Sequence, residues 1–205
     1  VMLAGYEMDF PELLNDSLSR NEFRLGEQFV NQNGHRVLWL VTLGRLAGIG
    51  FSVLGAMACF FWGRDLYGYD AGLLASGLWC FSPLVLGHAA LLTPDAPAAA
   101  LGTLACYTFW QWLKHPTWKR TIATGIILGL AELSKMTLIL FYPLWPVLWF
   151  IYRWKERSTM NFSRWRNEGV MLIARMLIGL YVINFGYMFT GSFMPLNEYV
   201  FKSEM

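Results

Sequence analysis

The sequence predicts an all-α fold, a polytopic transmembrane helical bundle. Of its 205 residues, 56% are hydrophobic and only 15% are charged, and the mean hydropathy is +0.39. Apolar runs of the length that crosses a bilayer as a helix recur along the chain. Basic residues gather in alternate segments between these runs, as the positive-inside bias of membrane proteins expects. Together these observations predict about six membrane helices.

The candidate membrane helices cover residues 37–62, 71–92, 96–113, 121–135, 136–152 and 170–190. The fourth and fifth runs are short. Pro143 and Pro146 also allow them to form one bent unit with its joint near Ser134 and Lys135. Gly125 and Gly129 are small residues four positions apart. Such a pair lets helix backbones approach closely, which indicates packing rather than chemistry.

The distribution of basic residues predicts the orientation of these runs in the membrane. If the chain starts outside and the first run crosses inward, the inner segments hold most of the 16 lysines and arginines. Asp95, His88 and Lys135 then share the outer face. The inner basic residues are Arg64, Lys114, Lys119, Arg120, Arg153, Lys155, Arg157, Arg164 and Arg166. The basic and aromatic segment 152–168 is then a membrane-surface loop held by anionic lipids.

The predicted organisation has three parts. Residues 1–36 form an outer-face segment with acidic and apolar residues interleaved, as in amphipathic surface helices or, alternatively, a solvated loop. Residues 37–190 form the transmembrane core, and residues 191–205 form an outer-face tail that leads to a missing C-terminal part. Because the chain starts at Val1 without a signal-peptide pattern, we expect an upstream portion as well.

Several function classes are disfavoured by composition. A net charge of +2 is too small to indicate nucleic-acid binding. The three cysteines, Cys59, Cys80 and Cys106, lie in apolar runs at spacings that fit neither a zinc site nor a disulfide framework. We therefore predict no metal site from these residues and interpret the cysteines as small apolar side chains.

Asp95 and His88 are the first candidates for function, because ionisable groups at membrane depth are costly and usually face a cavity or a partner. Thr93 and Pro94 precede Asp95, so a helix start with Thr93 as N-cap and Pro94 as the first helical residue explains the carboxylate structurally. The same position also suits a carboxylate that holds a hydroxyl or a cation. His88 is either a packing residue or part of the same site.

Four further charged residues lie in or beside the apolar runs. Glu132 and Lys135 are three residues apart, so they either neutralise each other or leave Lys135 to receive a lipid phosphate. Arg45 lies within the first run and pairs with an acidic group such as Asp95 or binds an anionic head group. Arg175 lies nearer the inner end of its run and is predicted to snorkel to the membrane surface.

The order of several motifs resembles the core of GT-C type membrane glycosyltransferases, in the protein O-mannosyltransferase and aminoarabinose transferase group. The motifs are Gly44-Arg45-Leu46, the segment 66–75, Phe81-Ser82-Pro83-Leu84, His88 with Thr93-Pro94-Asp95, and the segment 125–135. The resemblance covers roughly residues 26–152. The family's first span and the acidic motif after it have no counterpart here, so the chain is expected to be an internal fragment that is inactive alone.

The resemblance implies transfer of a sugar from a polyprenyl-phosphate donor to a lipid, glycan or protein acceptor at the outer face of a plasma (inner) membrane. It implies that Asp95 is the catalytic candidate and supports the site, while basic residues neutralise the lipid phosphate. We assign Arg45, His88, Lys135 and Glu132 as candidate substrate-binding residues. No cofactor is indicated beyond the lipid-linked sugar as substrate, and a divalent metal stays open. The alternatives are a transporter or lipid-handling scaffold, and a structural subunit.

Overall fold

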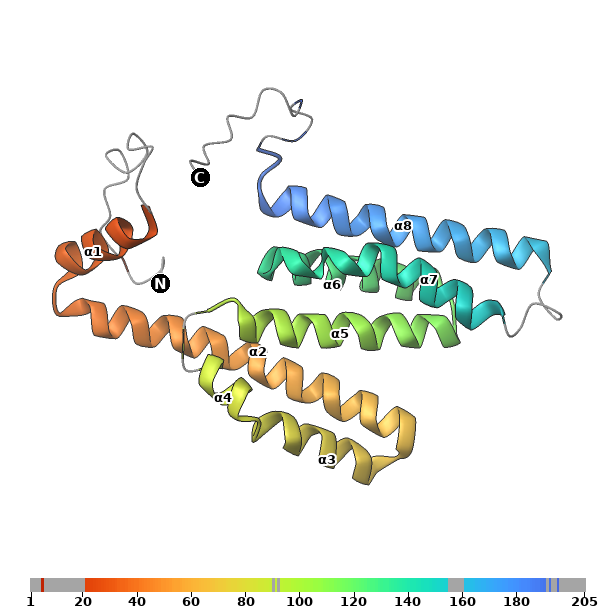
Figure 1. Cartoon of the computed structure of the whole chain (residues 1–205), viewed down its shortest axis with the longest axis horizontal. Helices are drawn as coiled ribbons and strands as arrows, with labels where there is room; N and C mark the ends of the chain where they lie inside the picture. Colours follow the sequence, from red (N-terminus) through yellow and green to blue (C-terminus); the bar gives the residue numbers. More distant parts are fainter. Residues whose placement is uncertain are drawn as a thin grey trace, which may run out of the picture. The chain divides into compact units, whose positions relative to one another are not determined.

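The computed structural model describes Gly5, residues 21–89, Leu91, residues 93–154 and 161–190, Ser192 and Pro195. Every regular element within these residues is helical, which confirms the predicted all-α class. The elements are α1 (Asn21–Asn33), α2 (Arg36–Tyr67), α3 (Tyr69–Cys80), α4 (Pro83–Ala89), α5 (Asp95–Lys114), α6 (Trp118–Ser134), η2 (Met136–Leu140), α7 (Phe141–Trp154) and α8 (Phe162–Gly186) (Figure 1).

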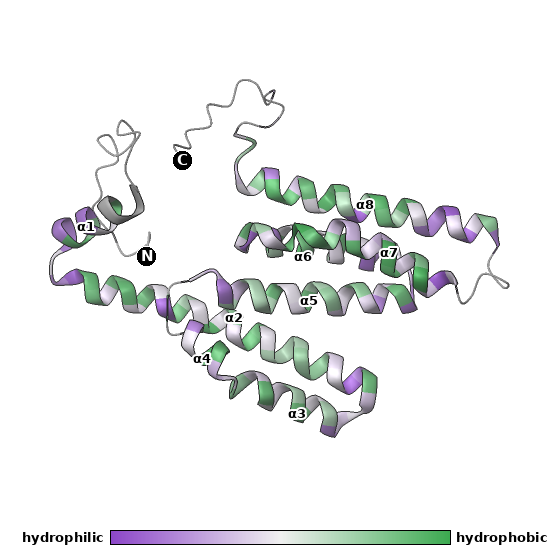
Figure 2. Ribbon diagram, viewed as in Figure 1, coloured by the Kyte–Doolittle hydropathy of each residue, from purple (hydrophilic) through white to green (hydrophobic). Residues whose placement is uncertain are grey.

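The chain forms two compact units, residues 1–47 with 193–205, and residues 48–192. The first unit contains α1, which is mainly hydrophilic (Figure 2), and the first part of α2. The predicted amphipathic segment 1–36 thus contains a helix, although most of residues 1–20 and all but Pro195 of residues 193–205 lie outside the described part. The candidate site and the helical bundle belong to the second unit.

Within the described residues, three helical segments are long and apolar enough to cross a membrane, namely Arg36–Tyr67, Met136–Trp154 and Phe162–Gly186. They match the first, fifth and last predicted spans. The other three predicted spans correspond to α3 with α4, to α5 and to α6, and they stay predictions. The run 71–92 is broken, because α3 ends at Cys80 and α4 begins at Pro83. Proline lacks an N–H and disfavours helical geometry in the residue before it, which explains this break.

Helices α5, α6, α7 and α8 lie roughly along one direction, and each runs opposite to the one before it in the sequence (Figure 1). The predicted joint at Ser134 and Lys135 is present, since α6 ends at Ser134 and Lys135 is extended, with φ −158° and ψ 117°. The chain reverses there, so α6 and α7 are separate antiparallel helices rather than one bent unit. Gly125 and Gly129 pack α6 on α8, because a Cβ at Gly129 would meet the Cβ of Val182 at 2.6 Å.

The core of the bundle is a stack of aromatic rings around a buried arginine. The rings of Phe109 and Trp145 are stacked with their centroids 4.5 Å apart, and the Arg175 guanidinium lies 3.8 Å from the centroid of the Trp112 ring. Arg175 is fully buried, and its guanidinium nitrogens make no hydrogen bond within the described residues. The predicted snorkelling of Arg175 is therefore wrong, because its helix turns this position toward the aromatic core, where cation–π contacts stabilise the charge.

A buried polar network joins α5, α7 and α8. Arg153 donates to the Glu168 carboxylate at 2.6 Å and to the Leu113 carbonyl oxygen at 2.7 Å, and the Trp149 indole donates to the same carboxylate at 3.0 Å. Arg153 and Glu168 are 1% and 3% exposed in their side chains. Residues 155–160 of the predicted surface loop 152–168 lie outside the described part. Arg153 of this segment faces the interior, where its hydrogen bonds connect α7 to α8 and to α5.

We predict that Glu168→Gln lowers the free energy of unfolding by about 3 kcal/mol or more, because it removes the negative charge that the buried Arg153 contacts at 2.6 Å. Arg164→Gln is the matched control. Arg164 contacts the same carboxylate at 3.1 Å, but its side chain is 48% exposed, so its loss should cost roughly 0.5 kcal/mol. Unfolding monitored in mixed detergent micelles checks both values. Equal effects of the two substitutions would contradict the buried network.

Candidate functional site

Three breaks in helical structure bring ionisable side chains to one place. His88 lies near the end of α4, Asp95 is the first residue of α5, and Lys135 lies between α6 and η2. The N-cap of α5 is Pro94 rather than the predicted Thr93, since the first helical bond runs from the Ala98 N–H to the Pro94 carbonyl oxygen at 2.9 Å. Asp95 therefore begins the helix, where its negative charge is favoured by the helix dipole.

Lys135 and Asp95 form the central contact of the site. The Lys135 Nζ lies 2.6 Å from Asp95 Oδ1, a short charge-assisted hydrogen bond, and the two side chains are 42% and 35% exposed. The Lys135 ammonium holds the pKa of the Asp95 carboxyl below its usual range, and His88 adds to this effect. Asp95 is thus a charged, oriented carboxylate at neutral pH.

His88 completes the cluster from the other side of the carboxylate. Its Nδ1 lies 3.5 Å from Asp95 Oδ2 and 3.4 Å from the Thr93 hydroxyl. Thr93, predicted as a helix cap, therefore contacts the imidazole instead. The two oxygens of Asp95 face different partners, Lys135 on one side and His88 on the other.

Glu132 does not pair with Lys135, contrary to one of the two sequence-based interpretations. It is buried, and neither of its carboxylate oxygens makes a hydrogen bond within the described residues. The spacing of three residues brings side chains together only on a continuous helix, whereas α6 ends at Ser134 and Lys135 is extended. The break directs Lys135 toward Asp95. Glu132 stays inside the bundle, where it interacts electrostatically with Tyr142.

Arg45 belongs to the other compact unit, residues 1–47, and its side chain is exposed on α2. Its grouping with Asp95 stays a prediction. Of the five candidate residues, the structure thus brings three together, Asp95, Lys135 and His88. Within the described residues, no three His, Cys, Asp or Glu side chains group in a way that would hold a metal ion.

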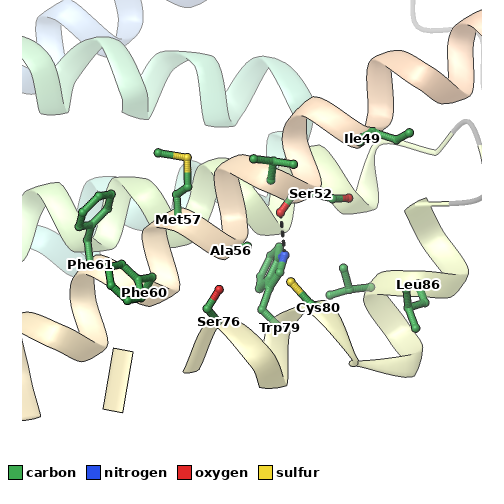
Figure 3. A pocket seen from close by; sticks show the side chains of 12 residues that line it. Ile49, Ser52, Ala56, Met57, Phe60, Phe61, Ser76, Trp79, Cys80 and Leu86 are labelled. Carbon is green, nitrogen blue, oxygen red and sulfur yellow. Dashed lines mark hydrogen bonds between the residues drawn. The ribbon is translucent and has the colours of Figure 1, made fainter. Parts of the chain in front are cut away.

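An apolar cavity of about 410 Å³ lies between α2, α3 and α4 (Figure 3). Trp79 lines this cavity, and the Trp79 indole N–H donates to the Ser52 carbonyl oxygen at 3.0 Å. Val85 and Leu86 line the cavity from α4, the same short helix that carries His88. No sequence pattern predicts this cavity. Helix α4 forms part of its lining and is separate from α3, because the predicted single span 71–92 is broken at residues 81–82.

Comparison with known proteins identifies one family. The family model described as dolichyl-phosphate-mannose-protein mannosyltransferase matches residues 40–178. The match spans all five candidate residues and most of the helical bundle. No curated protein and no solved structure matches the chain.

We predict that Lys135→Met raises the pKa of the Asp95 carboxyl toward its ordinary value, because the substitution removes the ammonium that stabilises the charged form. The pH titration of the Asp95 carboxyl carbon by NMR measures this change. Lys135→Arg, which keeps the positive charge, is the control and should leave the titration close to that of the unmodified chain. An identical Asp95 titration in Lys135→Met would show that the contact has no electrostatic effect.

Proposed function

Because the chain belongs to the dolichyl-phosphate-mannose-protein mannosyltransferase family, a family of membrane glycosyltransferases, we propose that it acts on a polyprenyl-phosphate sugar donor. The sugar passes to an acceptor at the outer face of the membrane. The observation that carries this proposal is the contact of Lys135 with Asp95 at 2.6 Å, next to His88, within the matched region.

Lys135 takes the phosphate of the donor in this proposal. An ammonium group has three N–H donors, and Asp95 occupies one of them. The other donors are available to phosphate oxygens. During transfer, an acceptor oxygen bonds to the anomeric carbon while the bond from that carbon to the phosphate oxygen breaks. Negative charge then develops on the leaving phosphate, where a fixed cation stabilises it most.

Asp95 positions the reacting groups. Its lowered pKa makes it a weak base at neutral pH, which favours orientation of a hydroxyl over proton abstraction. The acceptor proton passes to a base other than Asp95. His88 turns Nδ1 to Asp95 and Thr93, so Nε2 is the ring nitrogen offered to the sugar or the phosphate. Arg45 and Glu132 are proposed to bind or support the donor from α2 and α6.

The apolar cavity between α2, α3 and α4 suits the hydrocarbon tail of such a donor (Figure 3). Its volume falls in the range of about 300–1,000 Å³ that is usual for ligand sites. His88 and the cavity-lining residues Val85 and Leu86 lie on one helix of seven residues. A lipid phosphate at the charged cluster therefore has an apolar wall close by for its chain.

In the complete protein, we predict that Asp95→Asn abolishes sugar transfer but leaves expression and membrane insertion intact, because the amide keeps the shape of the side chain and loses its charge. Transfer from a purified polyprenyl-linked sugar is the measurement. The matched control is Asp70→Asn in the first turn of α3, which should transfer sugar at the unmodified rate. Unchanged transfer by Asp95→Asn would remove Asp95 from the site.

The outward orientation gives a second prediction, based on the bias of basic residues toward one side. A reporter fused after Leu113 should behave as cytoplasmic, and one fused after Thr190 as external. Paired phosphatase and fluorescent-protein fusions at both positions measure this. The reverse pattern would place the charged cluster on the inner face and overturn the proposed side of transfer.

A further inference from the structure

His88 has a ring nitrogen without a partner, on a side chain that a substrate can reach. The side chain is 35% exposed, and its Nδ1 faces two oxygens, Asp95 Oδ2 at 3.5 Å and the Thr93 hydroxyl at 3.4 Å. Within the part of the chain that the structure describes, Nε2 makes no hydrogen bond. What Nε2 can do therefore depends on which of the two nitrogens carries the proton.

The neighbours of Nδ1 select one tautomer of the ring. A carboxylate oxygen only accepts hydrogen bonds, so a lone pair on Nδ1 would face the negative charge of Asp95. A proton on Nδ1 replaces this repulsion by attraction, and such contacts are often long before the substrate binds. In a neutral imidazole, the nitrogen that lacks the proton is an acceptor. The contacts at Nδ1 thus leave the lone pair on Nε2.

The charge of the cluster is balanced without a second proton on His88. The Lys135 ammonium lies 2.6 Å from Asp95 Oδ1, so the single negative charge of Asp95 already has its counter-ion. An ionised phosphodiester has no proton to donate, and the Nε2 lone pair would repel its oxygens, whereas a hydroxyl can donate to Nε2. Nε2 therefore suits the hydroxyl of the acceptor rather than the phosphate of the donor.

Two other groups that could act as a base lie away from Asp95 or out of reach. Glu132 is buried inside the bundle, and neither of its carboxylate oxygens is accessible to a substrate. His115 directly follows α5, a helix of 20 residues that extends about 30 Å from its start at Asp95. His88 thus combines access, a free lone pair and proximity to Lys135 through their shared contact with Asp95.

Resting on the proposed function, we propose that His88 is the general base of the transfer. Nε2 takes the proton of the acceptor hydroxyl while the acceptor oxygen bonds to the anomeric carbon. The electron pair of the breaking bond goes to the phosphate oxygen beside Lys135. Asp95 stabilises the imidazolium that forms, and this imidazolium then releases its proton to water. One oxygen of Asp95 thus holds the base, and the other holds the cation that binds the phosphate.

The first test measures transfer of mannose from polyprenyl phosphate mannose by the complete protein, in membranes that contain the acceptor. In His88→Gln, kcat should fall about a hundredfold or more, because glutamine forms hydrogen bonds but cannot take the proton. The affinity for polyprenyl phosphate, measured by ³¹P NMR, should stay unchanged, since His88 faces the acceptor. His115→Gln is the matched control. It alters an exposed histidine at the other end of α5 and should transfer at the unmodified rate.

Imidazole in the buffer should restore transfer in His88→Gly, where it can take the place of the lost ring, and should not affect His115→Gly. Unchanged transfer in His88→Gln would overturn the proposal. A fall in polyprenyl phosphate affinity as large as the fall in transfer would also overturn it, by assigning His88 to the phosphate, and so would the absence of rescue. Failure of the unmodified protein to transfer the sugar would instead contradict the proposed function, and the proposed base with it.

A second readout needs no activity. The ¹⁵N NMR shifts of the His88 ring in the full chain report which nitrogen carries the proton. At neutral pH we expect a protonated Nδ1 and an unprotonated Nε2. Asp95→Asn should give a mixture of both tautomers, because the charge that holds the proton on Nδ1 is gone. A proton on Nε2 in the unmodified chain, alone or together with one on Nδ1, would contradict the assignment of His88 as the base.

Discussion

A charge inside an apolar helical bundle needs a partner, and this constraint accounts for most of the specific contacts in the chain. Arg153 and Glu168 satisfy it within the interior, where they tie α7 to α8 and to the end of α5. Arg175 satisfies it with aromatic rings in place of an anion. Asp95 and Lys135 satisfy it at a partly exposed place where helices begin and end. Among these three arrangements, only the last is both charged and open to a substrate, which is why we assign function to it.

The breaks in the helices place this pair. Pro83 separates α4 from α3, Pro94 precedes the start of α5, and the extended Lys135 ends α6. At each break, the side chain points in a direction that it could not take on a continuous helix. The break after α3 also contributes to the apolar cavity beside His88. In the function that we propose, the charged cluster takes the phosphate of the lipid-linked sugar and the apolar cavity takes its hydrocarbon chain.

Composition and the order of motifs were sufficient to predict the all-α class, the family and the junction at Ser134 and Lys135, because these depend on local signals. Asp95 and Lys135 were predicted to share one membrane face, but their direct contact was not predicted, because it depends on the extended conformation of Lys135 after α6. The expected pairing of Glu132 with Lys135 failed because helical spacing assumes a helix that continues. The pair of Arg153 and Glu168 was missed, since its members lie on different helices and no periodicity links them. Arg175 was misplaced because hydropathy does not tell which face of a helix is turned to the core.

The central claim is that Lys135 receives the phosphate of a lipid donor beside Asp95. Titration of the chain with polyprenyl phosphate, followed by ³¹P NMR, tests it most directly. We expect a saturable shift of the phosphorus resonance. The affinity that it reports should fall at least tenfold in Lys135→Met and stay unchanged in Lys119→Met, which removes an exposed lysine near the start of α6. Equal titration curves for the two variants would contradict it.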